Sequence, residues 1–147
     1  MYEMIISVTS MVLSSAISIF TLFFTAHREN QNMLRKSKIE QIEKLYLPFY
    51  KNCVLMFYPK YQFSELDEKA QNYFEESIFK NIQFGSTRTQ MYYIEFHKLW
   101  MNSPSRTNDN VTDSNVDAAF KKLYDSVISE YIYLCKKTKL PAPPLQS

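Results

Sequence analysis

The sequence predicts an all-α protein in which one N-terminal transmembrane helix continues into a small cytoplasmic antiparallel helical bundle. No charged side chain occurs from Met4 to Ala26, and the 147 residues include a single glycine, Gly85. In the remainder, apolar residues recur every three or four positions, which places them on one face of a helix. Strand-rich domains need more turn glycines than this chain has.

We expect four segments along the chain. A transmembrane helix covers residues 1–26, a basic helical stalk 27–47, the helical bundle 48–139, and a disordered proline-rich tail 140–147. The uncharged run of 23 residues from position 4 to position 26 is long enough for a hydrocarbon core of about 30 Å. A cleaved signal peptide is the alternative. It requires Lys or Arg before the apolar run, and this chain has neither there.

The charges beside the run predict its orientation. Only Glu3 precedes the run, whereas a basic group follows it. Positive residues stay in the cytoplasm, so the N-terminus is expected outside and the bundle inside, with these basic residues at the lipid headgroups. The formal net charge is only +2, which argues against duplex nucleic acid as a partner. The basic group consists of Arg28, Arg35, Lys36 and Lys38.

The stalk is expected to run on from the membrane helix until a proline interrupts it. Apolar residues from Ile39 to Cys53 continue the same helical phase. Pro48 cannot donate a backbone hydrogen bond, which predicts a kink or break near Leu47.

Three further helices are expected in the bundle. Ser64 and Asp67 resemble a capping box that opens a helix ending before Gly85. The next helix covers Thr87 to Met101, and a polar loop follows at 102–115. Asn115 is expected to cap the last helix, which ends in the basic run KKTK.

Hydroxyl side chains form a stripe along the expected membrane helix. They recur at heptad-like spacing, which puts them on one face. Small hydroxyl residues let membrane helices approach closely and hydrogen bond, so the stripe could form the interface of a homo-oligomer of four or more chains, or line a pore. Alternatively, each hydroxyl bonds a carbonyl of its own helix. The stripe consists of Ser7, Ser14, Ser18, Thr21 and Thr25.

The sequence holds no motif for catalysis, a metal or a cofactor. It lacks a glycine-rich phosphate loop, a nucleophile elbow and metal-ligand spacing, and Cys53 and Cys135 are expected to be free thiols. We therefore expect no enzyme. Arg88 at a helix start and His97 beside an aromatic face are the candidate ligands for a small anion. A solvated arginine and a packed histidine are the alternatives.

The order of one span, a basic stalk and the segment QIEKLYLPFYKN resembles small single-span helical membrane effectors of bacterial anti-phage, CRISPR-associated defence. Some of these effectors bind a cyclic oligoadenylate in a cytoplasmic helical domain. The resemblance implies a ligand-gated oligomer in the bacterial inner membrane that perturbs the membrane during infection. The alternative function is a non-conducting membrane anchor or adaptor that recruits a cytoplasmic partner protein.

Overall fold

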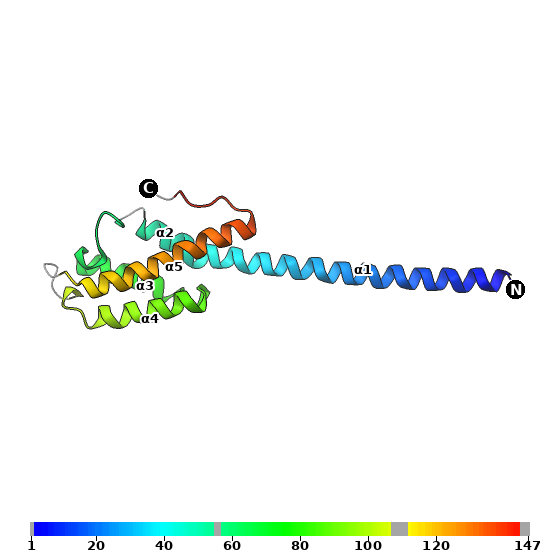
Figure 1. Cartoon of the computed structure of the whole chain (residues 1–147), viewed down its shortest axis with the longest axis horizontal. Helices are drawn as coiled ribbons and strands as arrows, with labels where there is room; N and C mark the ends of the chain where they lie inside the picture. Colours follow the sequence, from blue (N-terminus) through cyan, green and yellow to red (C-terminus); the bar gives the residue numbers. More distant parts are fainter. Residues whose placement is uncertain (1, 55–56, 107–111, 145–147) are drawn as a thin grey trace. The chain divides into compact units, whose positions relative to one another are not determined.

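The computed structural model describes the backbone of residues 2–54, 57–106 and 112–144, and the side chains in these ranges from residue 14 onward. Every regular element in these ranges is helical, which confirms the predicted all-α class. The chain divides into two compact units, residues 1–37 and residues 38–147 (Figure 1).

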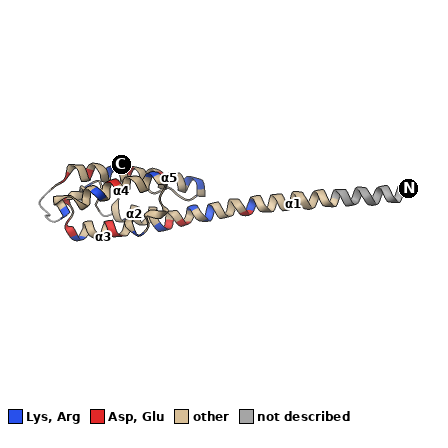
Figure 2. Cartoon of the chain, turned by 90° about the horizontal axis from the view of Figure 1, so that it is seen from below, with Lys and Arg blue, Asp and Glu red and all other residues tan. Residues whose placement is uncertain are grey.

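The first unit is the greater part of α1 (Tyr2–Gln41), and its described side chains are exposed. Figure 2 shows that the charged residues in the coloured part of α1 lie toward its C-terminal end. The larger apolar residues between positions 17 and 24 are between 61% and 75% exposed. They are Ile17, Ile19, Phe20, Leu22, Phe23 and Phe24.

The predicted membrane placement is wrong for the part of the chain that the structure describes. No helix there is long and apolar enough to cross a membrane. The absence of charge over a run does not suffice, because the hydroxyl residues between positions 14 and 25 and the charged residues from Arg28 onward lower the mean hydropathy of the described part of α1. A single-pass protein of the bacterial inner membrane with its N-terminus outside is therefore not supported. The predicted contact with lipid headgroups depended on that span and is not supported either. It concerned Arg28, Arg35, Lys36 and Lys38.

Two hydroxyls of the predicted stripe bond their own helix. Ser18 Oγ donates to the Ser14 carbonyl and Thr21 Oγ1 to the Ile17 carbonyl, each at 2.8 Å. This is one of the alternatives that the sequence left open, and it satisfies both hydroxyls without a partner helix. The side chain of Ser7 lies outside the described residues. A role for the stripe in chain assembly stays a prediction.

A short π-helix accommodates Pro48 where the first long helix ends. The π-helix spans Ile42–Tyr46, and the Leu47 N–H donates to the Ile42 carbonyl, five residues back. Helix α2 (Leu47–Cys53) follows with Pro48 in its first turn, where a missing N–H does no harm. The interruption predicted near Leu47 is present, and its form is a π-bulge.

The core of the second unit is an aromatic cluster between α4 (Thr87–Met101) and α5 (Ser114–Thr138) and the segments packed on them. The Phe63 ring stacks on Phe120 with centroids 5.1 Å apart and meets Phe96 edge-on at 4.9 Å. All three rings are fully buried. Phe63 comes from a 3₁₀ turn, Phe63–Glu65, that precedes α3 (Glu68–Phe79). Two further 3₁₀ turns, Ile82–Phe84 and Pro104–Arg106, connect the helices.

Side-chain caps fix where the bundle helices begin. Asp67 accepts from the Ala70 N–H, Ser86 from the Thr89 N–H, and Asp113 from two N–H groups of the first turn of α5. Helix α4 has the predicted bounds. The predicted caps at Ser64 and Asn115 are wrong, because Asp67 and Asp113 supply the oxygens.

The C-terminal segment packs on the bundle as far as Pro144. The Leu140 N–H donates to the Cys135 carbonyl, and Tyr50 OH donates to the Pro144 carbonyl. Residues 139–144 form no regular helix. The predicted disorder of residues 145–147 concerns positions outside the described residues.

Candidate ligand groove between α4 and α5

A groove of about 350 Å³ lies between α4 and α5 in the second unit. Helix α4 contributes its first two turns and α5 its middle turns. A volume near 300 Å³ is at the lower end of small-molecule sites. The side chains that define its chemistry are Arg88, Tyr92, Lys122, Ser126, Glu130 and Tyr133.

Arg88 stands at one end of the groove as the second residue of α4. Its guanidinium lies 5.6 Å from the centre of the Tyr92 ring, one turn along the same face. Among the described residues it pairs with no carboxylate. A guanidinium held over an aromatic ring by a cation–π contact keeps its N–H groups available for an oxygen ligand.

A chain of hydroxyls behind the groove ends on the Glu130 carboxylate. Thr89 Oγ1 donates to Glu130 Oε2 at 2.8 Å and lies 2.9 Å from Ser126 Oγ. Thr89 has one hydroxyl hydrogen, so Ser126 must donate to Thr89. Tyr46 OH donates to the same Glu130 oxygen at 2.5 Å. Burial, reinforced by the Glu130 charge, raises the pKa of Tyr46 far above its usual value, which keeps this hydrogen in place.

The charge of the groove is mixed. Lys122 Nζ pairs with Glu95 Oε1 at 2.9 Å on the surface. Asp125 and Ser129 also line the groove and are exposed. Two cations, Arg88 and Lys122, and two carboxylates, Asp125 and Glu130, therefore line the groove together. Figure 2 shows the same mixture of acidic and basic residues over the helices of the second unit.

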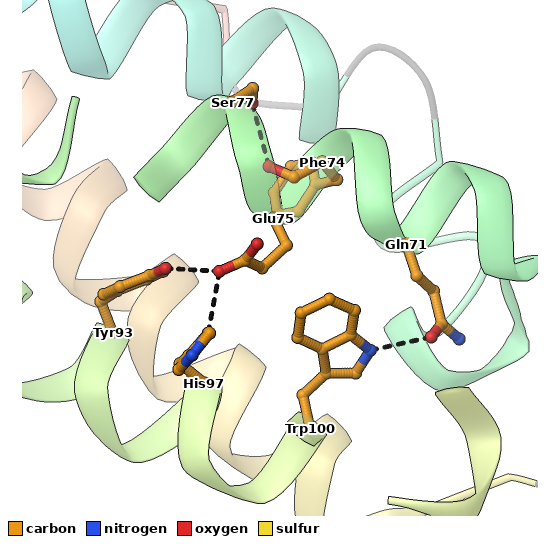
Figure 3. Close-up of polar contacts among 7 residues, drawn as sticks. All are labelled: Gln71, Phe74, Glu75, Ser77, Tyr93, His97 and Trp100. Atoms are coloured by element: carbon orange, nitrogen blue, oxygen red, sulfur yellow. Dashed lines mark hydrogen bonds and ion pairs between the residues drawn. The ribbon is translucent and has the colours of Figure 1, made fainter. Parts of the chain in front are cut away.

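His97 lies in a different cluster, against α3. Its Nδ1 is 2.8 Å from Glu75 Oε1, but the ring N–H is not aligned for a hydrogen bond. Tyr93 OH donates to the same oxygen at 2.5 Å, as Figure 3 shows. Burial, with help from Glu75, raises the pKa of Tyr93 well above its usual value. His97 therefore serves as part of an α3–α4 contact.

The structure does not join the two predicted anion ligands into one site. They are nine residues apart on α4, about 13 Å along a helix. Arg88 lines the α4–α5 groove, and His97 contacts Glu75 of α3. Sequence reasoning missed Glu130, although the sequence places it three residues after Val127 and four before Leu134, at the edge of the buried face of α5.

Reactive groups are scarce near the groove. Cys53 and Cys135 are buried free thiols, and burial raises the pKa of each, so neither is a ready nucleophile. Within the described ranges, no three His, Cys, Asp or Glu side chains gather into a group that could hold a metal ion.

Comparison of this chain with protein-family models, with curated proteins and with solved structures finds no match.

Proposed function

We propose that this chain is a non-enzymatic binding protein whose α4–α5 groove takes a nucleotide-like ligand. The observation that carries the proposal is Arg88, an arginine without a carboxylate partner among the described residues, whose guanidinium lies over the Tyr92 ring in a groove. An oriented guanidinium of this kind suits phosphate oxygens, which it can contact through two N–H groups.

The rest of the groove suits the other parts of such a ligand. Tyr92 and Tyr133 line the groove, and each ring has a cation, Arg88 or Lys137, over one face, which leaves the opposite face for a base to stack on. Ser126 has lone pairs left after it donates to Thr89, and Glu130 has a second oxygen, Oε1, without a partner among the described residues. These acceptors suit the amino group of a base such as adenine. A nucleotide combines the three groups that these residues suit: a phosphate, an aromatic base and an amino group on the base.

The resemblance extends this proposal to a biological role. It implies that the ligand is a cyclic oligoadenylate and that binding triggers an effector of anti-phage defence. It also implies a homo-oligomer of four or more chains. We propose that ligand binding changes either the assembly of chains or the recruitment of a partner protein. Recruitment of a partner is the alternative function that the sequence suggests.

Binding of defined adenylates tests the groove. Cyclic oligoadenylates, linear oligoadenylates and inorganic phosphate are titrated onto the full chain, and affinity is measured by calorimetry. Arg88→Ala is expected to weaken binding of the adenylate at least tenfold. Arg106→Ala is the matched control, because Arg106 also stacks on an aromatic ring, that of Trp100, and does not line the groove. Equal losses in both variants, or no binding of any probe, contradict the proposal.

A second candidate function, an adaptor that assembles through α1, has its own supporting observation. The large apolar side chains at positions 17–24 are exposed, and such a face is covered in solution by another apolar surface. Replacing Phe20 and Phe23 with Ser is expected to lower the assembled mass of the full chain in light scattering. Arg88→Ala should not change that mass, which separates the two functions.

A further inference from the structure

The side of α4 that faces solvent carries an apolar stripe with one charge of each sign. Met91, Ile94 and Met101 are 65%, 50% and 43% exposed, although the opposite side of α4 is fully packed in the core. Residues 91, 94, 98 and 101 repeat at spacings of three and four, which is the seam of a helix that packs against another helix. The outer α4 face is defined here as Met91, Ile94, Glu95, Lys98 and Met101.

We propose that the outer α4 face binds the same face of a second copy of this chain in an antiparallel, two-fold pair. In a two-fold interface, residue i of one copy contacts residue j of the other, and j contacts i, so the face must be complementary to itself. The outer α4 face meets this condition. Its single acid, Glu95, and its single base, Lys98, lie close to its centre.

The antiparallel register follows from those charges. With the two-fold axis between Glu95 and Lys98, Glu95 of each copy faces Lys98 of the other. Ile94 of each copy then lies within about two residues, or about 3 Å along the helix axis, of Met101 of the other. Both apolar residues are on the same side of the helix, and in an antiparallel pair like sides meet. One register therefore brings together the opposite charges and the apolar side chains.

Within one chain, Glu95 and Lys98 each keep polar atoms available for a contact with the second copy. Glu95 Oε1 is paired with Lys122, and its Oε2 has no partner among the described residues. Lys98 pairs with no carboxylate there. A parallel pair would instead place each Glu95 beside Glu95 and each Lys98 beside Lys98, which repels. The two charges thus select the antiparallel arrangement.

The test is the mass of the full chain by light scattering and sedimentation, measured as a function of concentration. Wild type is expected to form a concentration-dependent assembly that Ile94→Glu weakens at least tenfold. Phe79→Glu is the matched control, because Phe79 is a similarly exposed apolar residue on α3. Circular dichroism of each variant verifies that the bundle is folded.

A charge reversal keeps the proposal testable even if Ile94→Glu fails to fold. Glu95→Lys and Lys98→Glu are each expected to weaken the assembly, and the double variant is expected to restore it. Carbodiimide coupling of a ¹⁴N/¹⁵N mixture should link Glu95 of one isotope to Lys98 of the other. A monomer at all concentrations, an assembly unchanged by every α4 variant because it forms through α1 alone, or a double variant no better than the singles would overturn the proposal.

Discussion

Thr89 on α4 donates its hydroxyl hydrogen to Glu130 on α5 at 2.8 Å, and Tyr46 of the π-helix donates to the same oxygen. Thr89 is fully buried. Three segments of the second unit therefore meet at one carboxylate. A buried network of this kind holds the segments in one arrangement only while every hydrogen has an acceptor.

Thr89→Val is expected to destabilise the bundle by about 1–3 kcal/mol, because it removes one donor from Glu130 and leaves the Ser126 hydroxyl without its acceptor. Valine has nearly the same shape as threonine, so packing is preserved. Urea denaturation measures the loss. Thr87→Val is the control, since Thr87 is an exposed residue in the first turn of the same helix. Equal stability of the two variants would contradict the network.

The stability of the bundle is expected to decrease at alkaline pH. Burial and a neighbouring carboxylate raise the pKa of Tyr46 and of Tyr93 in the folded chain. A raised pKa in the folded state means that the stabilisation is complete below the unfolded value, about 10, and is lost as the pH rises above it. Each tyrosine contributes up to about 1.4 kcal/mol per pH unit in that window.

Urea midpoints between pH 8 and pH 11 test this pH dependence. Tyr93→Phe is expected to flatten the decline above pH 10. Tyr61→Phe is the control, because Tyr61 is exposed and its ring lies beside Lys60. A decline of the same steepness in wild type and Tyr93→Phe would show that other groups cause it.

The helices of the bundle were predictable where apolar spacing and packing agree. The bounds of α4 follow from Tyr93, Phe96 and Trp100, which are all buried as the spacing requires. Pro48 predicts the interruption near Leu47, because proline has no backbone N–H to donate. Both features are determined by residues that are close together in the sequence, so one sequence is enough to predict them.

Features that depend on distant partners were not predictable. Ser64 resembles a helix cap, but its N–H and hydroxyl both donate to Asp117, 53 residues away. Gln71 is polar and its neighbours in sequence do not indicate burial, yet it is fully buried. Its side chain accepts from Trp100 Nε1, as Figure 3 shows, and donates to the Leu66 carbonyl. The length and missing charge of the N-terminal run predict a membrane span, whereas no helix among the described residues is long and apolar enough to cross a membrane.

Gly85→Ala is expected to destabilise the bundle by about 1–2 kcal/mol through crowding. A Cβ at this position would lie 3.1 Å from Leu45 Cδ2 and 3.1 Å from Thr89 Cγ2. Leu45 and Thr89 are both buried, and Thr89 cannot turn aside without leaving Glu130. Gly85 has a φ of −76°, so alanine needs no left-handed backbone, and the Ile82 carbonyl oxygen, 3.2 Å from the added Cβ, contributes to the crowding. Thermal unfolding of Gly85→Ala in the Thr89→Ser background, where Cγ2 is absent, should show a smaller loss.

Asp117→Ala is expected to destabilise the bundle by about 1–3 kcal/mol, because Ser64 is fully buried and would lose the acceptor of its N–H and of its hydroxyl. Asp117→Asn should cost less. Its amide oxygen can accept from the Ser64 N–H while its amide group donates to the Ser64 hydroxyl. Asp125→Ala is the control, an exposed aspartate on the same helix. Urea denaturation orders the three variants. If Asp117→Ala is as stable as Asp125→Ala, Asp117 does not anchor the 3₁₀ turn at Phe63–Glu65 to the start of α5.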